Sequence, residues 1–190
     1  ISPLIRKDYL TSSILWCCCF FFIPFLFFIW IVQSINTNSN GFFLQKRIGQ
    51  YGKKFVILKF RTIHPKTSKI SRFSAFLRKY KIDELPQLFN VLIGQMSFVG
   101  PRPDIPGYYD LLEGENRKIL ELKPGLTSEA SLLFFNEEHF LANIENPLEY
   151  NDNVIFPQKV VLNLKYYNER SFFVDLCLIF KTISFLFTKG

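Results

Sequence analysis

Hydrophobic side chains are distributed very unevenly along this chain. Residues Ile14 to Val32 form an unbroken run of 19 uncharged and almost wholly apolar side chains, with Pro24 near the middle. At about 1.5 Å of rise per residue, a helix of this length would measure about 28 Å, close to the thickness of the hydrocarbon core of a bilayer. The pattern therefore predicts a membrane-embedded helix.

Basic residues stand on both sides of this run. Arg6 and Lys7 precede it, and Lys46 and Arg47 follow it after a polar stretch. Because positive charge marks the cytoplasmic side of a membrane segment, neither end resembles a translocated one. Proline lacks an amide hydrogen and clashes with the preceding turn, so Pro24 offers a place for a sharp helix break. A re-entrant helix and a single-pass helix both fit this pattern, since proline is tolerated in spans.

The remainder of the chain is long enough for one soluble domain. Of the 190 residues, about 150 follow residue 40, which suffices for a separate core. We expect residues 1–40 to be the membrane-embedded part and residues 41–190 to be a cytoplasmic domain. A cleaved secretory signal is disfavoured, because residues 36–40 contain no small-residue cleavage pattern. The formal charge of +7 indicates anionic partners such as lipid headgroups, phosphates or nucleic acid.

The pattern after residue 40 predicts an α+β domain that is mainly helical. A small β-hairpin is expected over Gly41 to Thr62, because residues 53–61 are rich in β-forming side chains. One helix is expected from Ser71, and a second from Asp83 to Gly94, where glycine provides a stop signal. Apolar residues predict the inner face of the second helix: Leu85, Leu88, Phe89 and Leu92.

The second half of the chain contains three further predicted helices. They cover Tyr108 to Leu122, Phe156 to Asn168 and Phe172 to Thr188, and residues 124–127 between them are expected to form a turn. The last helix is apolar but interrupted by charged residues, which argues against a second membrane span. We expect it to be an interfacial amphipathic helix.

Asp83 and Glu84 are adjacent carboxylates at the predicted start of a helix. Consecutive helical side chains point about 100° apart, but an N-cap residue is not yet helical. With Asp83 as the N-cap, both carboxylates could face one pocket beside helix N–H groups that favour phosphate. One carboxylate could then attack phosphorus while the other holds Mg²⁺. The plain alternative is that both residues simply start a helix.

Four basic residues are candidates for binding phosphate: Arg47, Lys59, Arg61 and Arg102. Taken singly, each of them is more often a solvated charge. Arg102 is the strongest candidate, because its flanking prolines fix the backbone and a guanidinium fork suits phosphate.

Several sequence segments, taken in their order along the chain, resemble those of the bacterial sugar transferase family. These segments are QKRIG, KFRT, FLRKYKIDELPQLFNVLIGQMSFVGPRP and KPGLT, behind a proline-bearing membrane helix. Members of the family are small monotopic phosphoglycosyl transferases that begin lipid-linked glycan synthesis. The stretch from Phe76 to Pro103 is long and highly specific, and the resemblance covers nearly the whole chain.

The resemblance implies a reaction and a cellular location. Family members embed a re-entrant helix, broken at a proline, in the inner membrane, with the catalytic domain on its cytoplasmic face. They transfer a sugar phosphate from a UDP-sugar to undecaprenyl phosphate and release UMP, through a covalent phosphosugar on an aspartate. The implied partners are therefore the UDP-sugar donor, the undecaprenyl phosphate acceptor and inner-membrane lipids, with no nucleic acid.

The resemblance also implies roles for individual residues. Asp83 matches the nucleophile and Glu84 matches the Mg²⁺ partner. Arg102, in the matching GPRP loop, would bind phosphate. Lys59, Arg61 and Arg47 would line the anionic site.

The chain departs from the family pattern at several positions. Ile23 replaces the serine that usually precedes the helix-breaking proline, and Ser74 replaces a glycine. The segment SEASLLFF follows PGLT in place of a GWAQVNG-like stretch, and Asn163 to Lys165 lack an acidic residue. We expect activity because the Asp83-Glu84 pair is intact. A degenerate member and a non-catalytic membrane-anchored basic module, binding anionic lipid or nucleic acid, are the alternatives.

Overall fold

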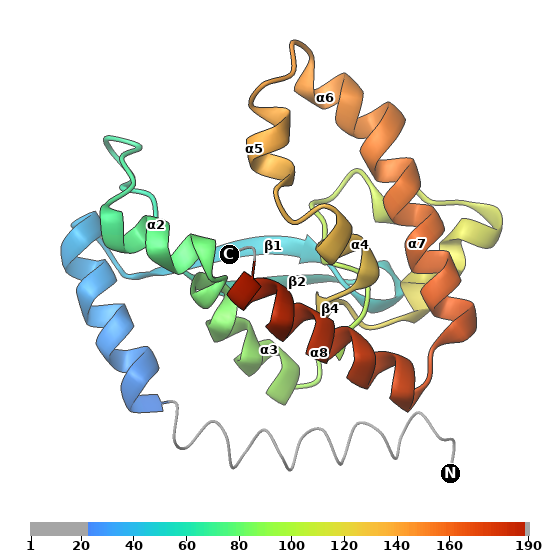
Figure 1. The fold of residues 1–190 in the computed structure, drawn as a ribbon, viewed down its shortest axis with the longest axis horizontal. Helices are drawn as coiled ribbons and strands as arrows, with labels where there is room; N and C mark the ends of the chain where they lie inside the picture. The colour runs from blue at the N-terminus through green and yellow to red at the C-terminus, as the bar shows by residue number, and fades with distance from the viewer. Residues whose placement is uncertain (1–22, 189–190) are drawn as a thin grey trace. The chain divides into compact units, whose positions relative to one another are not determined.

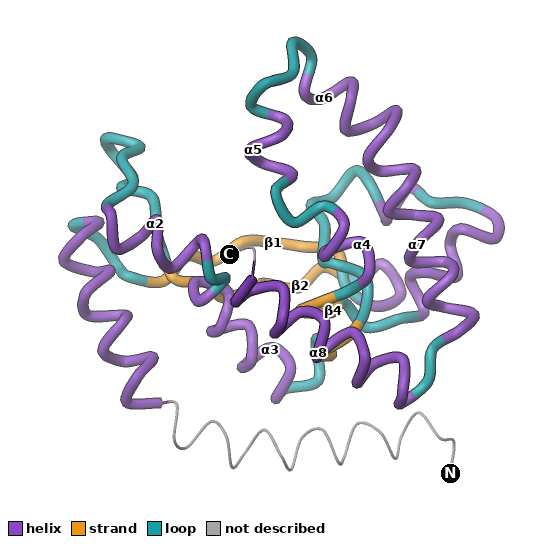
Figure 2. Tube along the Cα trace, viewed as in Figure 1, coloured by secondary structure: helices purple, strands orange, loops and turns teal. Residues whose placement is uncertain are grey.

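The computed structural model describes residues 23–188 of the chain (Figure 1). Within them, helices of several kinds accompany two two-stranded sheets. Figure 2 shows how small the share of strand is beside helix and loop. The predicted α+β class, with a mainly helical content, is confirmed, but the sequence predicted only one of the two sheets.

The described chain divides into two compact units. Unit 1 comprises residues 23–46, 55–96 and 186–188, and unit 2 comprises residues 47–54 and 97–185. The predicted domain boundary after residue 40 remains a prediction. Each unit is described by itself below.

Unit 1 begins with a helix over residues 23–37, followed by the predicted hairpin. The hairpin pairs β1, Phe42–Ile48, with β2, Lys54–Phe60, and its tip at residues 47–54 belongs to unit 2. The short 3-10 helix η1, Gln50–Gly52, connects the two strands of the hairpin. A turn is possible here because Gly52 adopts a φ of 73°, a left-handed conformation that costs glycine little.

The helix over residues 23–37 has one buried side and one exposed apolar side. Leu26 and Ile29 pack with Phe60 and Leu77 in the core of unit 1. The exposed apolar side chains of this helix are Ile23, Phe25, Phe27, Phe28, Ile31 and Ile35. No helix among residues 23–188 has the length and apolar character needed to cross a membrane. Residues 14–22 lie outside the described residues, so a re-entrant or spanning helix with a break at Pro24 remains a prediction.

The helix predicted from Ser71 is confirmed as α2, Arg72–Lys79. Ser71 is its N-cap, and the Ser74 amide donates a 3.1 Å hydrogen bond to Ser71 Oγ. Leu77 is fully buried in the core of unit 1, whereas Phe76 is half exposed, so only one side of the helix enters the core.

The helix predicted from Asp83 to Gly94 has two parts. The first is the 3-10 helix η2, Ile82–Gln87, and the second is α3, Leu88–Leu92. Asp83 is not the N-cap, and that prediction was wrong. Lys81 takes the cap position in a left-handed conformation, and the Glu84 amide donates to its carbonyl. Pro86 lies inside η2 and lacks the amide hydrogen that an α-helix would need there.

Unit 2 contains a parallel sheet that the sequence did not predict. β3, Ser97–Val99, pairs with β4, Gly125–Thr127, with Ser97 opposite Gly125 and Val99 opposite Thr127. The predicted turn at residues 124–127 is therefore wrong, because these residues form a ladder with a distant segment. The predicted helix over residues 108–122 is also wrong. It is two 3-10 helices, η3, Tyr109–Leu111, and η4, Gly114–Glu121.

The rest of unit 2 is helical. The predicted helices near the C-terminus are confirmed as α7, Phe156–Glu169, and α8, Phe172–Thr188, whose last three residues belong to unit 1. The elements before them were not predicted: α4, Glu129–Leu133; α5, Glu137–Leu141; α6, Pro147–Tyr150; and the π-helical turn η5, Asn151–Ile155. In the core of this unit, α7 contributes Val160 beside Tyr109 and Ile119.

α8 is amphipathic, but one of its charged side chains is buried and not exposed. Phe172, Phe173 and Phe180 are exposed, as expected for an interfacial helix. Asp175 is buried instead and accepts a 2.6 Å hydrogen bond from the hydroxyl of Tyr166 on α7. Asp175, one of the charged residues that interrupt the apolar pattern, therefore links α8 to α7 within unit 2.

Candidate active site

The Asp83-Glu84 pair lies in η2 of unit 1, largely withdrawn from solvent. Asp83 is 9% exposed, and its Oδ1 is buried without a hydrogen-bond partner among the described residues. A buried polar atom without a partner is costly, so native structures retain few of them. This oxygen is therefore a candidate for contact with a ligand or for a chemical role.

Burial, and to a smaller extent the neighbouring Glu84 carboxylate, raises the pKa of Asp83 from 3.8 to about 6. Lys59, Lys81 and Arg78 oppose this shift with their positive charges. Near neutral pH, Asp83 is thus mostly ionised yet more basic than an ordinary aspartate. These are useful properties for a nucleophilic carboxylate.

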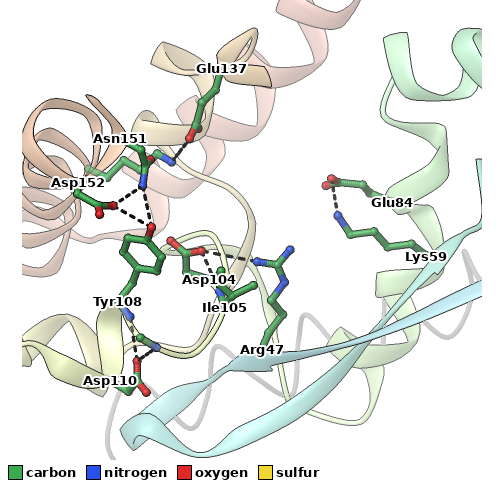
Figure 3. Close-up of polar contacts among 12 residues, drawn as sticks. Arg47, Lys59, Glu84, Asp104, Ile105, Tyr108, Asp110, Glu137, Asn151 and Asp152 are labelled. Carbon is green, nitrogen blue, oxygen red and sulfur yellow. Dashed lines mark hydrogen bonds and ion pairs between the residues drawn. The ribbon is translucent and has the colours of Figure 1, made fainter. Parts of the chain in front are cut away.

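Glu84 is held by a lysine of the hairpin. Lys59 Nζ donates to Glu84 Oε1 at 3.0 Å, and the two side chains are only 16% and 12% exposed (Figure 3). The structure thus brings three of the predicted site residues together, because Lys59 also acts electrostatically on Asp83. The sequence predicted phosphate as the partner of Lys59, and the contact with Glu84 was missed.

The two carboxylates have the donor chemistry for Mg²⁺. Magnesium prefers oxygen ligands and is typically held by one or two protein carboxylates together with substrate phosphate and water. Asp83 contributes a buried oxygen that no described residue hydrogen-bonds, and Glu84, the next residue, contributes a second carboxylate. Within residues 23–188, no group of three or more His, Cys, Asp or Glu side chains is placed to hold a metal. A two-carboxylate site completed by substrate fits these residues better than an all-protein cage.

Arg61 directly follows β2, and its amide donates to the Gly41 carbonyl just before β1. Its Nε donates to the Asn40 carbonyl at 3.1 Å, and its guanidinium lies 5.4 Å from the ring centre of Phe43. These contacts link the arginine to the start of β1. Its predicted phosphate-binding role remains a prediction.

Arg47 and Arg102 belong to unit 2. Arg47 Nη1 lies 3.6 Å from Asp104 Oδ1 (Figure 3), and Arg102 lines a small cavity with Gly49, Pro101 and Tyr109. The Arg102 backbone follows β3, and the Gly100 amide donates to the Thr127 carbonyl, so pairing with β4 anchors the start of this loop. The phosphate-binding roles of both arginines remain predictions.

Sequence reasoning missed a polar cluster in unit 2. Asp104 is its central carboxyl, and burial raises its pKa, with the Ile105 amide, Lys159 and Arg47 opposing the shift. Lys159 also forms a 2.7 Å ion pair with Glu137. The contributing residues are spread from β1 to α7, so no local motif connects them in the sequence.

A second polar group of unit 2 surrounds the π-helical turn. The hydroxyl of Tyr108 donates to Asp152 Oδ1 at 2.8 Å, and Asn151 Nδ2 donates to the same hydroxyl at 3.1 Å (Figure 3). The extra residue of a π-helical turn brings both side chains to Tyr108. The sequence carried no signal for this turn.

A buried, basic carboxylate beside a second carboxylate and a lysine defines a site suited to group transfer at phosphorus. The family model for bacterial sugar transferases matches residues 5–189. The chain therefore belongs to the bacterial sugar transferase family and is a transferase enzyme. This result favours an enzyme over the alternative of a non-catalytic basic module.

Individual relatives support the same assignment. The uncharacterized sugar transferase EpsL of Bacillus subtilis is 34% identical over 92% of this chain and 82% of its own length. The UDP-glucose:undecaprenyl-phosphate glucose-1-phosphate transferase of Caulobacter vibrioides is 30% identical over 88% of this chain and 64% of its own length. The exopolysaccharide production protein ExoY of Rhizobium meliloti is 28% identical over 85% of this chain and 76% of its own length. The chain is thus a phosphoglycosyl transferase in the broad sense of these names.

Proposed function

We propose that this enzyme transfers a sugar-1-phosphate from a UDP-sugar to undecaprenyl phosphate and releases UMP. The observation that carries the proposal is the buried Oδ1 of Asp83, which has no hydrogen-bond partner within residues 23–188 and lies beside the Glu84–Lys59 ion pair. The name of the Caulobacter relative supports the lipid acceptor and the nucleotide-sugar donor.

The proposed reaction has two steps at one phosphorus atom. In the first step, Asp83 Oδ1 forms a bond to the phosphorus that carries the sugar. The bond from that phosphorus to the bridging oxygen breaks, and UMP leaves with the electron pair. In the second step, a phosphate oxygen of undecaprenyl phosphate attacks the same phosphorus, and the carboxylate of Asp83 leaves.

The surrounding residues would support this attack electrostatically. Glu84 would hold Mg²⁺, which when bound neutralises charge on the diphosphate. Lys59 fixes the Glu84 carboxylate through their 3.0 Å contact. Arg102, Arg61 and Arg47 would bind donor phosphate or acceptor phosphate, because a guanidinium fork matches phosphate oxygens.

The lipid acceptor requires a membrane surface, and two helices support that part of the proposal. The helix over residues 23–37 exposes a series of apolar side chains, and α8 exposes Phe172, Phe173 and Phe180. Large apolar side chains on a helix surface suit insertion at a lipid interface. We place the enzyme at the bacterial inner membrane, with its catalytic residues on the cytoplasmic face, where UDP-sugars are made.

The decisive experiment is UMP release by purified protein in membrane mimetics, with UDP-sugar, Mg²⁺ and undecaprenyl phosphate. Asp83→Asn should abolish UMP release, and intact-mass measurement of wild-type protein with donor alone should show an added phosphosugar. Asp152→Asn is the matched control, because an amide oxygen can still accept the Tyr108 hydrogen bond. Full activity of Asp83→Asn would remove Asp83 as the nucleophile. Wild-type protein that binds anionic vesicles or nucleic acid but releases no UMP would favour the non-catalytic alternative.

A further inference from the structure

Asn90 is a buried polar side chain of α3 with no role in the proposed chemistry. It is 5% exposed, and its amide makes three hydrogen bonds. Asn90 Nδ2 donates to the Val56 carbonyl at 2.7 Å and to Gln95 Oε1 at 2.8 Å. Asn90 Oδ1 accepts from the Leu58 amide at 3.2 Å.

Two of these bonds reproduce the pairing of a β-strand. Val56 and Leu58 are two residues apart on β2, so their carbonyl and amide face the same edge of the hairpin. A neighbouring strand would satisfy both groups, and here the side-chain amide of Asn90 does so. A two-stranded sheet is only marginally stable alone. The two hydrogen bonds from Asn90 therefore stabilise the hairpin by joining the edge of β2 to α3.

The same segment carries the candidate active-site carboxylates. η2 and α3 are continuous from Ile82 to Leu92, with Glu84 near the start and Asn90 near the end. Lys59, the residue after Leu58, reaches Glu84 at 3.0 Å. The segment therefore contacts β2 twice, once through backbone hydrogen bonds to Asn90 and once through the ion pair.

We propose that Asn90 is a positioning residue that holds β2 in register with η2, so that Lys59 stays paired with Glu84 beside Asp83. This inference rests on the proposed function for its effect on catalysis. Asparagine suits the position because its short side chain carries an NH2 group that donates to both Val56 and Gln95 and an oxygen that accepts from Leu58. Aspartate would lack the donor for Val56, and glutamine would carry its amide one methylene farther from the helix.

A double-mutant cycle tests whether Asn90 acts through Lys59. Asn90→Ala should lower kcat for UMP release by about tenfold to hundredfold, with a smaller change in KM, because a small misplacement of a catalytic group is costly. In a Lys59→Ala background, the same substitution should lower kcat no further. The unfolding midpoint should fall in both backgrounds, and by less where Lys59 is already absent. An equal loss of kcat in both backgrounds, or an unchanged kcat, would overturn the proposal.

A second readout does not depend on activity. The acylation rate of Lys59 by an amine-reactive ester, followed by mass spectrometry, should rise severalfold in Asn90→Ala. Gln95→Ala is the matched control, since it removes the third bond of Asn90 and leaves the bonds to β2. Its Lys59 should react at the wild-type rate, and the exposed Lys165 provides an internal reference.

These readouts separate failure of the inference from failure of the proposed function. An unchanged Lys59 acylation rate in Asn90→Ala would overturn the inference, whatever the activity. If Lys59 is acylated faster in Asn90→Ala but the wild-type protein releases no UMP, the positioning of Lys59 is supported and the proposed function is rejected. If Asn90→Ala does not fold, judged by circular dichroism, Asn90→Ser is used instead, because its hydroxyl ends one bond short of the amide atoms that reach Val56 and Leu58.

Discussion

Lys59 Nζ lies 3.0 Å from Glu84 Oε1, and the two side chains are only 16% and 12% exposed. The pair joins β2 to the segment that carries Asp83. Removing one partner of a largely buried ion pair leaves a charge without compensation, which costs more than the pair contributes as a whole.

Lys59→Ala should therefore destabilise the protein by about 3 kcal/mol in free energy of unfolding. Urea unfolding in detergent measures this change. Lys165→Ala is the control, because the 3.5 Å pair of Lys165 with Glu129 is almost half exposed at both ends. That substitution should cost less than about 1 kcal/mol. Equal losses of stability for the two variants would show that the Lys59–Glu84 pair contributes no more than an exposed ion pair.

Asp83→Asn should stabilise the protein near pH 7 in magnesium-free buffer. The pKa of Asp83 is raised from 3.8 to about 6, so the folded state binds a proton more tightly than the unfolded state. Stability from Asp83 is then greatest below pH 4 and is lost as the pH rises through 6. The ionised form costs up to about 3 kcal/mol, which the amide avoids.

The stability difference between Asp83→Asn and wild-type protein should accordingly shrink as the pH falls from 7 to 4. Urea unfolding at several pH values measures it. A difference that grows towards low pH would mean that the pKa of Asp83 is depressed instead.

The first half-reaction should lose rate below about pH 6, because the Asp83 carboxylate becomes protonated there. The measurement is the initial burst of UMP from UDP-sugar without acceptor lipid, so that ionisation of the acceptor phosphate does not contribute. Lys59→Ala should move the acidic limb to higher pH, since Lys59 lowers the pKa of Asp83. A burst rate that is constant from pH 5 to 8 would exclude Asp83 as the ionising nucleophile.

Local patterns in the sequence predicted the elements whose signals are local. The hairpin, α2, α7 and α8 follow from β-forming runs and from helical runs of apolar side chains. The parallel sheet of β3 and β4 could not be predicted in this way. Its strands have three residues each, and the pairing of Ser97 with Gly125 depends on a contact between distant segments.

The candidate site was predicted by residue but not by geometry. The Asp83-Glu84 pair has a recognisable motif, yet the N-cap hypothesis failed because Lys81 adopts a left-handed conformation with a φ of 54°. An ordinary lysine carries no sequence signal for that conformation. The contacts of Asn90 with β2 were likewise hidden, since an asparagine in a helical run is usually read as neutral.

Gly125→Ala tests the backbone approach that supports the Arg102 loop. A Cβ at Gly125 would overlap the backbone of Gly100, the residue that follows β3. The Gly125 amide also donates to the Pro101 carbonyl at 2.9 Å, so a shift of β4 would move the loop that carries Arg102. We expect a loss of about 3 kcal/mol or more in free energy of unfolding, because two backbones must separate.

Gly114→Ala is the matched control for this prediction. Gly114 has a φ of 55°, but a Cβ there would meet nothing within 4 Å. The substitution should lower the free energy of unfolding by about 1 kcal/mol, the cost of placing alanine in the left-handed conformation. Urea unfolding of both variants, with UMP release assayed at a temperature where each is folded, separates stability from activity. If folded Gly125→Ala retains wild-type kcat and KM, the β3–β4 approach does not position Arg102 for phosphate.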